Sequence, residues 1–273
     1  MVTRAPDTSG ERLRLPVRDL DRAPPLVYGP VDSLRYGRSL GINLLPPGLR
    51  LCNFDCLYCQ CGGRRTRRRE REDPPFPTLA ALERDLARAL ASGPVIDDIC
   101  FAGAGEPTLH PRFREAVLLA RRLREELAPR ATVTVLSNGT TACKPGVRAA
   151  LALADRAVLK LDAVCDDTLR QLDRPPSGLS ARRLVKTFAE MMGVETQTML
   201  VHGAADNTAP GALDALGDAL RAIFPRCAYL GTITRRPAGP LADDGLTPLA
   251  PAELQSAAAR VRRRAPGVDI RVY

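Results

Sequence analysis

Six short apolar runs rich in β-branched residues alternate with segments of helical periodicity, and this alternation constrains the fold more than any other feature of the sequence. The runs predicted to be strands are 39–45, 95–103, 131–137, 156–162, 194–201 and 227–234. The segments predicted to be helices are 79–90 behind an N-cap at Thr78, 113–127 with Pro111 in its first turn, 145–154, 179–192, 211–224 and 250–264. Repetition of this kind predicts parallel strands joined by right-handed crossovers.

The number of strand–helix units indicates an incomplete barrel. Eight such units close a full barrel of about 250 residues. Six units predict an α/β fold: a partial (β/α)6 TIM-like barrel of parallel strands, with an open doubly wound sheet as the alternative. Residues 268–273 are expected to add an edge strand. No repeat or linker divides residues 28–273, so we interpret them as a single domain behind a flexible N-terminal arm, residues 1–27.

Polar residues follow every predicted strand. These segments are 52–61, 103–107, 137–140, Asp162, 202–207 and 234–237. Because parallel strands end at the same edge of a sheet, the loops that carry these segments are expected to meet there. We therefore predict one catalytic site at the carboxyl ends of the strands.

The sequence also bears on the cellular compartment of the protein. There is no run of about 18 apolar residues that would span a membrane. The first twenty residues lack the apolar core of a secretory signal and carry acidic residues that transit peptides avoid. We expect a cytoplasmic protein without a membrane partner, in which thiols stay reduced.

The net charge of +9 leaves two interpretations open. A basic surface can attract RNA, but abundant arginine also results from a GC-rich genome. Lysine occurs only at positions 144, 160 and 186. The basic run 64–73 contains acidic residues and no aromatic residue for base stacking, which favours a solvated surface over a nucleic-acid-binding arm.

Four of the eight cysteines, Cys52, Cys56, Cys59 and Cys61, lie within ten residues. Clustered thiols in a reducing compartment indicate a metal site. Structural zinc is usually held by two cysteine pairs that are a dozen or more residues apart. Crowding in one loop instead favours an iron–sulfur cluster.

The spacing C-x3-C-x2-C, with Tyr58 before the last cysteine, resembles the radical S-adenosylmethionine (radical SAM) superfamily. The resemblance implies that Cys52, Cys56 and Cys59 hold three irons of a [4Fe–4S] cluster. S-adenosylmethionine chelates the open fourth iron. It further implies that one electron cleaves the sulfonium and that the resulting 5′-deoxyadenosyl radical abstracts hydrogen from a substrate. An external one-electron reductant, such as flavodoxin or ferredoxin, would then be a partner.

Residues 28–60 resemble a narrower signature, that of Fe–S oxidoreductases related to wybutosine-tRNA synthesis enzymes. This subgroup usually reads Y-G-P-V-x-S-R-R-L-G before the first strand. The present chain has Leu34 and Tyr36 in place of the first arginine and the leucine. The resemblance extends over roughly residues 28–237 and implies a radical SAM core fold.

Two further segments resemble S-adenosylmethionine contacts of that superfamily. The GGEP-like residues, expected to receive the methionine amino group, are Gly103, Ala104, Gly105, Glu106 and Pro107. Ser137 and Asn138 are expected to reach the ribose hydroxyls. On their own, both segments are also typical of ordinary strand-end turns.

For several other side chains at the strand ends, the sequence allows two interpretations. Lys160 and Asp162 alternate to one face, and either they pair or one of them contacts the cofactor or the substrate. His202 is a catalytic or a surface histidine. Arg235 and Arg236 clamp an anionic substrate or form a solvated pair. Cys61 is hypothesised to be no cluster ligand.

These features favour a radical SAM enzyme whose substrate is an RNA base, a peptide or protein, or a small metabolite. The alternative is an electron-transfer iron–sulfur protein in which Cys61 completes the cluster. A scaffold with polar loops at every strand end exceeds the needs of electron transfer. The GGEP-like segment has no role in that alternative.

Overall fold

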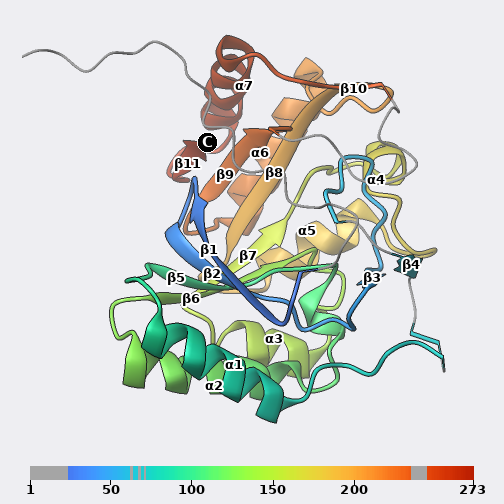
Figure 1. Ribbon diagram of the computed structural model, residues 1–273. Coiled ribbons are helices and arrows are strands. Elements are labelled where there is room, and N and C mark those ends of the chain that lie inside the picture. The colour runs from blue at the N-terminus through green and yellow to red at the C-terminus, as the bar shows by residue number, and fades with distance from the viewer. Residues whose placement is uncertain (1–23, 62–63, 67–68, 71, 235–244) are drawn as a thin grey trace, which may run out of the picture.

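A computed structural model describes residues 24–61, 64–66, 69–70, 72–234 and 245–273. Its centre is a curved sheet of parallel strands with helices on the outside (Figure 1). The six parallel strands, in sheet order, are β2 (Gly37–Ile42), β5 (Asp98–Phe101), β6 (Thr132–Ser137), β7 (Arg156–Lys160), β8 (Glu195–Gly203) and β9 (Ala228–Thr232). Each of the six overlaps one of the predicted strands. The partial (β/α)6 barrel is therefore confirmed.

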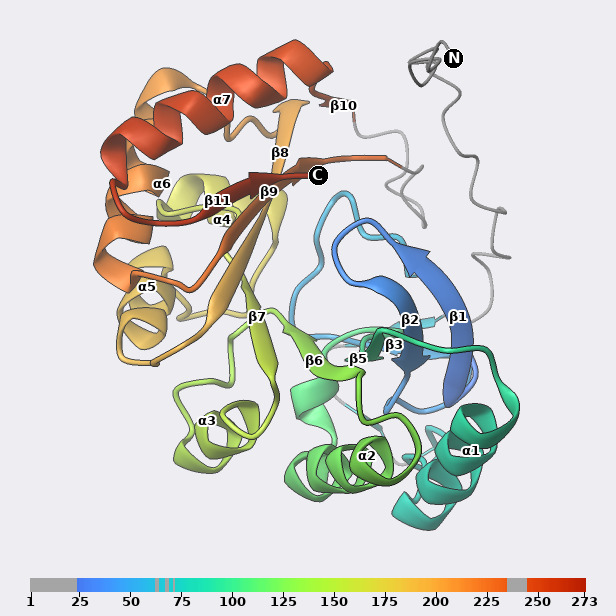
Figure 2. The same cartoon turned by 90° about the vertical axis from the view of Figure 1, so that its left-hand side faces the viewer.

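Three further strands extend this sheet. β1 (Val27–Ser33) pairs antiparallel with β2, β10 (Leu246–Pro248) pairs antiparallel with β8, and β11 (Ile270–Val272) pairs parallel with β9. β11 confirms the expected edge strand, whereas β1 and β10 were not predicted. Among the described residues β1 and β11 are the two ends of the strand order, so the barrel stays open between them (Figure 2).

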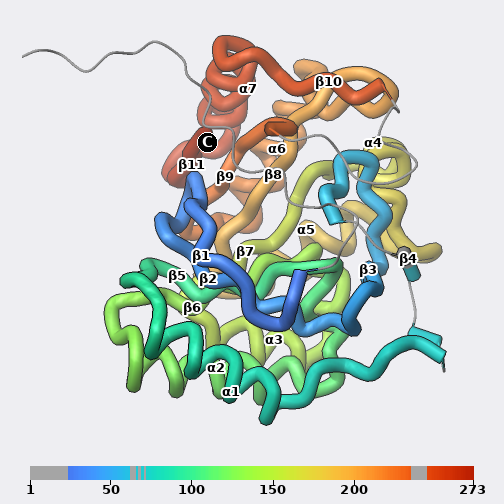
Figure 3. Tube along the Cα trace, in the orientation of Figure 1, coloured from blue at the N-terminus to red at the C-terminus, as the bar shows by residue number. Residues whose placement is uncertain are grey.

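Seven α-helices lie in the described part of the chain and follow the sheet in chain order, as the tube trace shows (Figure 3). They are α1 (Leu79–Ser92), α2 (Phe113–Leu127), α3 (Pro145–Leu151), α4 (Asp166–Leu172), α5 (Ala181–Ala189), α6 (Pro210–Ile223) and α7 (Pro251–Arg264). Thr78 caps α1 as expected, because its side chain accepts a hydrogen bond from the Ala81 amide.

The predicted range of α2, 113–127, is confirmed, but the predicted place of Pro111 was wrong. Pro111 precedes the N-cap residue, Arg112, and does not lie in the first turn. A tight turn, closed by the Phe113 N–H donating to the His110 carbonyl, occupies this position. The unpredicted α4 has only seven residues, too few to show a helical period clearly.

The two faces of the sheet differ in character. Side chains such as Phe101, Val135 and Leu159 are fully buried between the strands and the helices. Because side chains alternate along a strand, Lys160 and Gln197, which are adjacent in register, point to the opposite face and into the barrel. The outer face is the hydrophobic core, and the inner face carries the polar groups.

Most of the predicted N-terminal arm lies outside the described residues. The end of that predicted arm, residues 24–27, is attached to the sheet, because the Asn43 side chain donates to the Pro24 carbonyl, the Asn43 amide donates to the Leu26 carbonyl, and β1 begins at Val27. In the part of the chain that the structure describes, no helix combines the length and apolarity that crossing a membrane requires.

Candidate active site

The clustered cysteines lie on a loop, residues 52–61, that we call the cysteine loop. It runs between two short parallel strands, β3 (Leu49–Leu51) and β4 (Arg64–Thr66), which the sequence did not reveal. The Cys52 amide donates to the Thr66 carbonyl at 3.1 Å. This pairing closes the base of the loop.

The GGEP-like segment, 103–107, lies directly beside the start of the cysteine loop. The Leu51 amide donates to the Ala104 carbonyl, and the Glu106 amide donates to the Leu51 carbonyl, both at 3.0 Å. Two segments that are fifty residues apart in sequence, each predicted to contact the cofactors, are therefore adjacent in the fold.

Gly105 makes this approach possible. Its φ is +140°, and a Cβ at this position would lie 1.9 Å from the Leu51 carbonyl oxygen. Any other residue would push the segment away from the cysteine loop. The glycine therefore serves close backbone packing against the start of the cysteine loop.

The end of α4 holds the other side of the cysteine loop. The Asp55 amide donates to the Asp173 carbonyl and the Leu57 amide donates to the Leu172 carbonyl, both at 2.9 Å. Leu57 also packs against Leu172 in a small buried cluster. The loop is thus fixed by segments that follow β5 and β7 as well as by β4.

Two thiols of the loop have a polar neighbour at hydrogen-bonding distance. Cys52 Sγ accepts from Asn138 Nδ2 at 3.6 Å, and Cys61 Sγ donates to the Gly103 carbonyl at 3.0 Å. In the described ranges no three His, Cys, Asp or Glu side chains form a group suited to one metal ion. A cubane cluster binds each thiolate at a different iron, so it suits thiols that are spread along a loop.

The thiols differ in how readily they ionise. A hydrogen bond from Cys61 lowers the pKa of Cys59 to about 5, and Arg50 adds to this effect. Burial raises the pKa of Cys52 to about 12 and that of Cys56 well above its ordinary value. A metal cluster binds thiolates, so its positive irons would have to supply the charge that ionises Cys52 and Cys56.

Glu106 joins the ends of β5 and β6. Its carboxylate accepts from Thr108 Oγ1 at 2.6 Å, from Ser137 Oγ at 2.7 Å and from the Asn138 amide at 2.7 Å. The side chain of Asn138 donates to Asn53 on the cysteine loop at 2.8 Å. Of the two predicted ribose contacts, Ser137 is engaged by Glu106 and Asn138 faces the cysteine loop.

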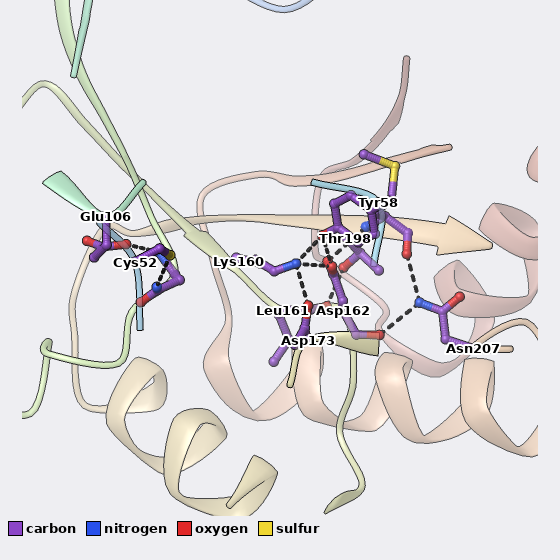
Figure 4. Close-up of polar contacts among 11 residues, drawn as sticks. Cys52, Tyr58, Glu106, Lys160, Leu161, Asp162, Asp173, Thr198 and Asn207 are labelled. Atoms are coloured by element: carbon purple, nitrogen blue, oxygen red, sulfur yellow. Dashed lines mark hydrogen bonds and ion pairs between the residues drawn. The ribbon is translucent and has the colours of Figure 1, made fainter. Parts of the chain in front are cut away.

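A buried ionic network lies beside the cysteine loop inside the barrel (Figure 4). Lys160 Nζ contacts the Tyr58 hydroxyl, Asp162 and Asp173, the last at 2.6 Å. Both carboxylates are almost fully buried. Burial by itself would lower the pKa of Lys160, but Asp162 and Asp173 outweigh it and raise that pKa well above its ordinary value. Lys160 and Asp162 therefore pair, one of the two outcomes expected.

Two members of this region were not singled out by the sequence. Asp173 balances Lys160 from the end of the short helix α4. Asn207 donates to the carbonyls of Asp162, at 2.9 Å, and Met199, at 2.7 Å, and so ties the segment after β8 to the end of β7 (Figure 4). For Asn207, the sequence offered one signal: an amide side chain within the polar segment 202–207 that was predicted to lie at the site.

The remaining candidates do not join the network. His202 contacts Thr208 at 2.8 Å and Glu253, near the start of α7, at 3.8 Å. These contacts support a structural role on the outer side of β8. Arg235 and Arg236 lie outside the described residues.

Comparisons with known proteins agree with this geometry. The family model described as the radical SAM superfamily matches residues 48–216, which include the cysteine loop and the GGEP-like segment. A UPF0026 protein of Synechocystis sp. is 36% identical over 183 residues, covering 65% of this chain and 65% of that protein. The chain thus spans about two thirds of this relative.

Solved structures of low sequence identity share the fold. SuiB of Streptococcus suis bound to S-adenosylmethionine matches with a TM-score of 0.59 and 14% identity, over 84% of this chain and 51% of that one. TYW1 with a lysine-pyruvate adduct matches with a TM-score of 0.58 and 14% identity, over 83% of this chain and 73% of that one. With its cysteine loop inside the matched region, the chain belongs to the radical SAM superfamily.

Proposed function

We propose that Cys52, Cys56 and Cys59 bind the [4Fe–4S] cluster of this radical SAM enzyme, and that S-adenosylmethionine binds between the cysteine loop and residues 103–107. Superfamily membership implies both cofactors. The observation that carries the residue assignment is the backbone pairing of Leu51 with Ala104 and Glu106. This pairing requires Gly105 and leaves the two predicted contact segments side by side.

The residues of the chain act in this scheme by binding and orientation. Once bound, the cluster and S-adenosylmethionine supply a 5′-deoxyadenosyl radical that abstracts hydrogen from the substrate. Glu106 fixes the segment after β6, and Asn138 in turn fixes the cysteine loop through Asn53. Lys160 holds the loop through Tyr58, and Asp173 holds it through its backbone carbonyl.

The substrate and the reductant belong to the proposal as well. The substrate is an RNA base, a peptide or protein, or a small metabolite, and a one-electron donor such as flavodoxin or ferredoxin reduces the cluster. Similarity to wybutosine-tRNA synthesis enzymes supports the first class, and the net charge of +9 adds weak support. We place the enzyme in the cytoplasm, where such donors work.

The proposal is tested with the full chain, purified without oxygen and reconstituted with iron and sulfide. About four irons per chain and conversion of S-adenosylmethionine to 5′-deoxyadenosine and methionine after reduction are expected. A full, reducible cluster without turnover would favour the electron-transfer alternative. In that alternative Cys61→Ala also loses the cluster, whereas our proposal expects this variant to keep its iron.

A further inference from the structure

Asn138 directs its side-chain amide at one of the proposed cluster ligands. It is the first residue after β6, and it is only 7% exposed. Its Nδ2 atom donates to Cys52 Sγ at 3.6 Å and to Asn53 Oδ1 at 2.8 Å. Because a side-chain amide has two N–H donors, both hydrogens of Asn138 are directed at the start of the cysteine loop.

The orientation of this amide is fixed by Thr140. The Thr140 backbone N–H donates to Asn138 Oδ1 at 3.0 Å, and the Thr140 hydroxyl donates to the same oxygen at 2.7 Å. A backbone N–H can only donate, so the oxygen of the Asn138 side chain must face Thr140. The nitrogen therefore faces Cys52, and an N–H group points at the sulfur.

Two further contacts hold Asn138 in place. Asn53 Nδ2 donates to the Thr140 hydroxyl at 2.6 Å, which closes a ring of hydrogen bonds through Asn138, Asn53 and Thr140. The Asn138 backbone amide donates to the buried carboxylate of Glu106 at 2.7 Å. The donor that faces the sulfur is therefore positioned by contacts within the protein.

These contacts use the full hydrogen-bonding capacity of the Asn138 side chain. Its oxygen accepts two hydrogen bonds from Thr140, and its nitrogen donates one to Asn53 and one to Cys52. A ribose hydroxyl, the partner that the sequence resemblance implied, would have to compete with one of them. The geometry favours a role toward the sulfur instead.

A hydrogen bond to a ligand sulfur has a defined effect on an iron–sulfur cluster. The reduction potential depends in part on hydrogen bonds to the sulfurs. Reduction adds a negative charge, so a donor to a ligand sulfur stabilises the reduced form more than the oxidised form. Burial strengthens this interaction because little water screens it. A donor held against Cys52 is therefore expected to raise the potential.

We propose that Asn138 donates a hydrogen bond to the ligand sulfur of Cys52 and so raises the midpoint reduction potential of the cluster, which extends the range of one-electron donors that can reduce it. This inference rests on the proposed function, because it takes Cys52 as a cluster ligand. Asn138 is a positioning and tuning residue in this scheme and transfers no group itself.

The test is a redox titration of the reconstituted full chain without S-adenosylmethionine, followed by the electron paramagnetic resonance signal of the reduced cluster. Asn138→Leu removes both donors at similar size and leaves no room for a water that would replace them. It is expected to lower the midpoint potential at unchanged iron content. Thr140→Val is the matched control, because it removes a hydroxyl from the same ring but keeps the backbone N–H that orients Asn138. This control is expected to keep the native potential.

Two outcomes of the titration overturn the inference. One is a potential in Asn138→Leu equal to or above that of the native chain at full iron content. If this variant also binds S-adenosylmethionine more weakly, Asn138 contacts the ribose. The other is a fall in Thr140→Val as large as that in Asn138→Leu, which would make the effect one of loop structure.

A second measurement needs no variant and decides the question if Asn138→Leu does not retain its iron. The native chain is labelled with nitrogen-15 in the side-chain amides of asparagine, and its reduced cluster is studied by pulsed electron paramagnetic resonance without S-adenosylmethionine. A coupling between the label and the cluster spin is expected, because the hydrogen bond carries spin density from the sulfur to the donor nitrogen. Its absence overturns the inference. Failure of the native chain to bind a cluster would instead refute the proposed function.

Discussion

The two ends of the barrel interior stabilise buried charge in different ways. At the carboxyl ends of the strands each buried cation is balanced by carboxylates: Lys160 by Asp162 and Asp173, and Arg50 by Asp55. Removing one member of such a set leaves an opposite charge uncompensated in a region of low polarity. Substitutions of charged residues are therefore expected to be tolerated least beside the cysteine loop.

At the amino ends of the strands the partners of buried charges are mainly neutral. The Arg35 guanidinium lies 4.8 Å from the ring centre of Tyr273 and 4.9 Å from that of Tyr36, and it donates to Gln197. Among the described residues, the side-chain donors to the Asp98 carboxylate are the hydroxyls of Ser39, Thr132 and Thr134. None of these six partners carries a charge of its own.

The difference teaches where mutation should affect function and where it should affect stability alone. A neutral partner that loses its ion becomes an ordinary hydrophobic or polar side chain. A charged partner that loses its ion must find another or change its protonation state. The following predictions compare the two ends directly.

The largest contrast concerns cysteine. Cys52→Ala, Cys56→Ala and Cys59→Ala are each expected to abolish cluster binding, measured as iron per chain and as visible absorption after reconstitution. Cys227→Ala, at the buried amino-end cluster, is the control and is expected to keep full iron content. Equal loss of iron in the control would remove the distinction between the two ends.

Lys160→Met should have the next largest effect. It leaves Asp162 and Asp173 buried together without a cation, and we expect a loss of about 3–5 kcal/mol in the free energy of unfolding. Denaturant unfolding at neutral pH measures it. Because Asp173 also holds the cysteine loop through its backbone carbonyl, iron content should fall as well.

Arg35→Met tests the amino end with the same kind of substitution. Its aromatic and amide partners carry no charge that would be left uncompensated, so the expected loss in unfolding free energy is about 1–2 kcal/mol. Iron content should equal that of the native chain. A loss as large as that of Lys160→Met would contradict the comparison.

The smallest effect is a pH dependence at Asp98. Burial raises the pKa of Asp98 above its ordinary value, although hydroxyl donors oppose the rise. The folded state therefore binds this proton more tightly than the unfolded state does. Relative to Asp98→Asn, the native chain should gain stability as the pH falls from about 7 through that raised pKa towards about 4. The measurement is the thermal unfolding of both proteins across this pH range. If their melting temperatures change with pH in parallel, the effect is excluded.

Much of the fold was predictable because it depends on local pattern. The six parallel strands overlap short runs rich in apolar and β-branched residues, which alternate with segments of helical periodicity. β1 was missed because its side chains show no regular alternation of buried and exposed positions. β3 and β4 have three residues each, and only their pairing with one another makes them strands.

The site was predictable where a motif or an alternation marks it. The pairing of Lys160 with Asp162 follows from two positions on one face of a strand. Asp173 and Arg50 join the site only through tertiary contacts, since nothing in their local sequence separates them from the other charged residues of the chain. Charge balance inside a barrel depends on which strands and loops meet there, and a sequence pattern does not contain that information.

The opening between β1 and β11 has a consequence for self-association. A strand at the border of a sheet can recruit a second copy through its unused amide and carbonyl groups. On β1, Pro30 lacks an amide hydrogen, and the pairing register shifts between Tyr28 and Val31. β11 is three residues long and carries the exposed Arg271. Both borders are therefore poor templates for intermolecular strand addition, and the barrel can remain open at its side without promoting aggregation there.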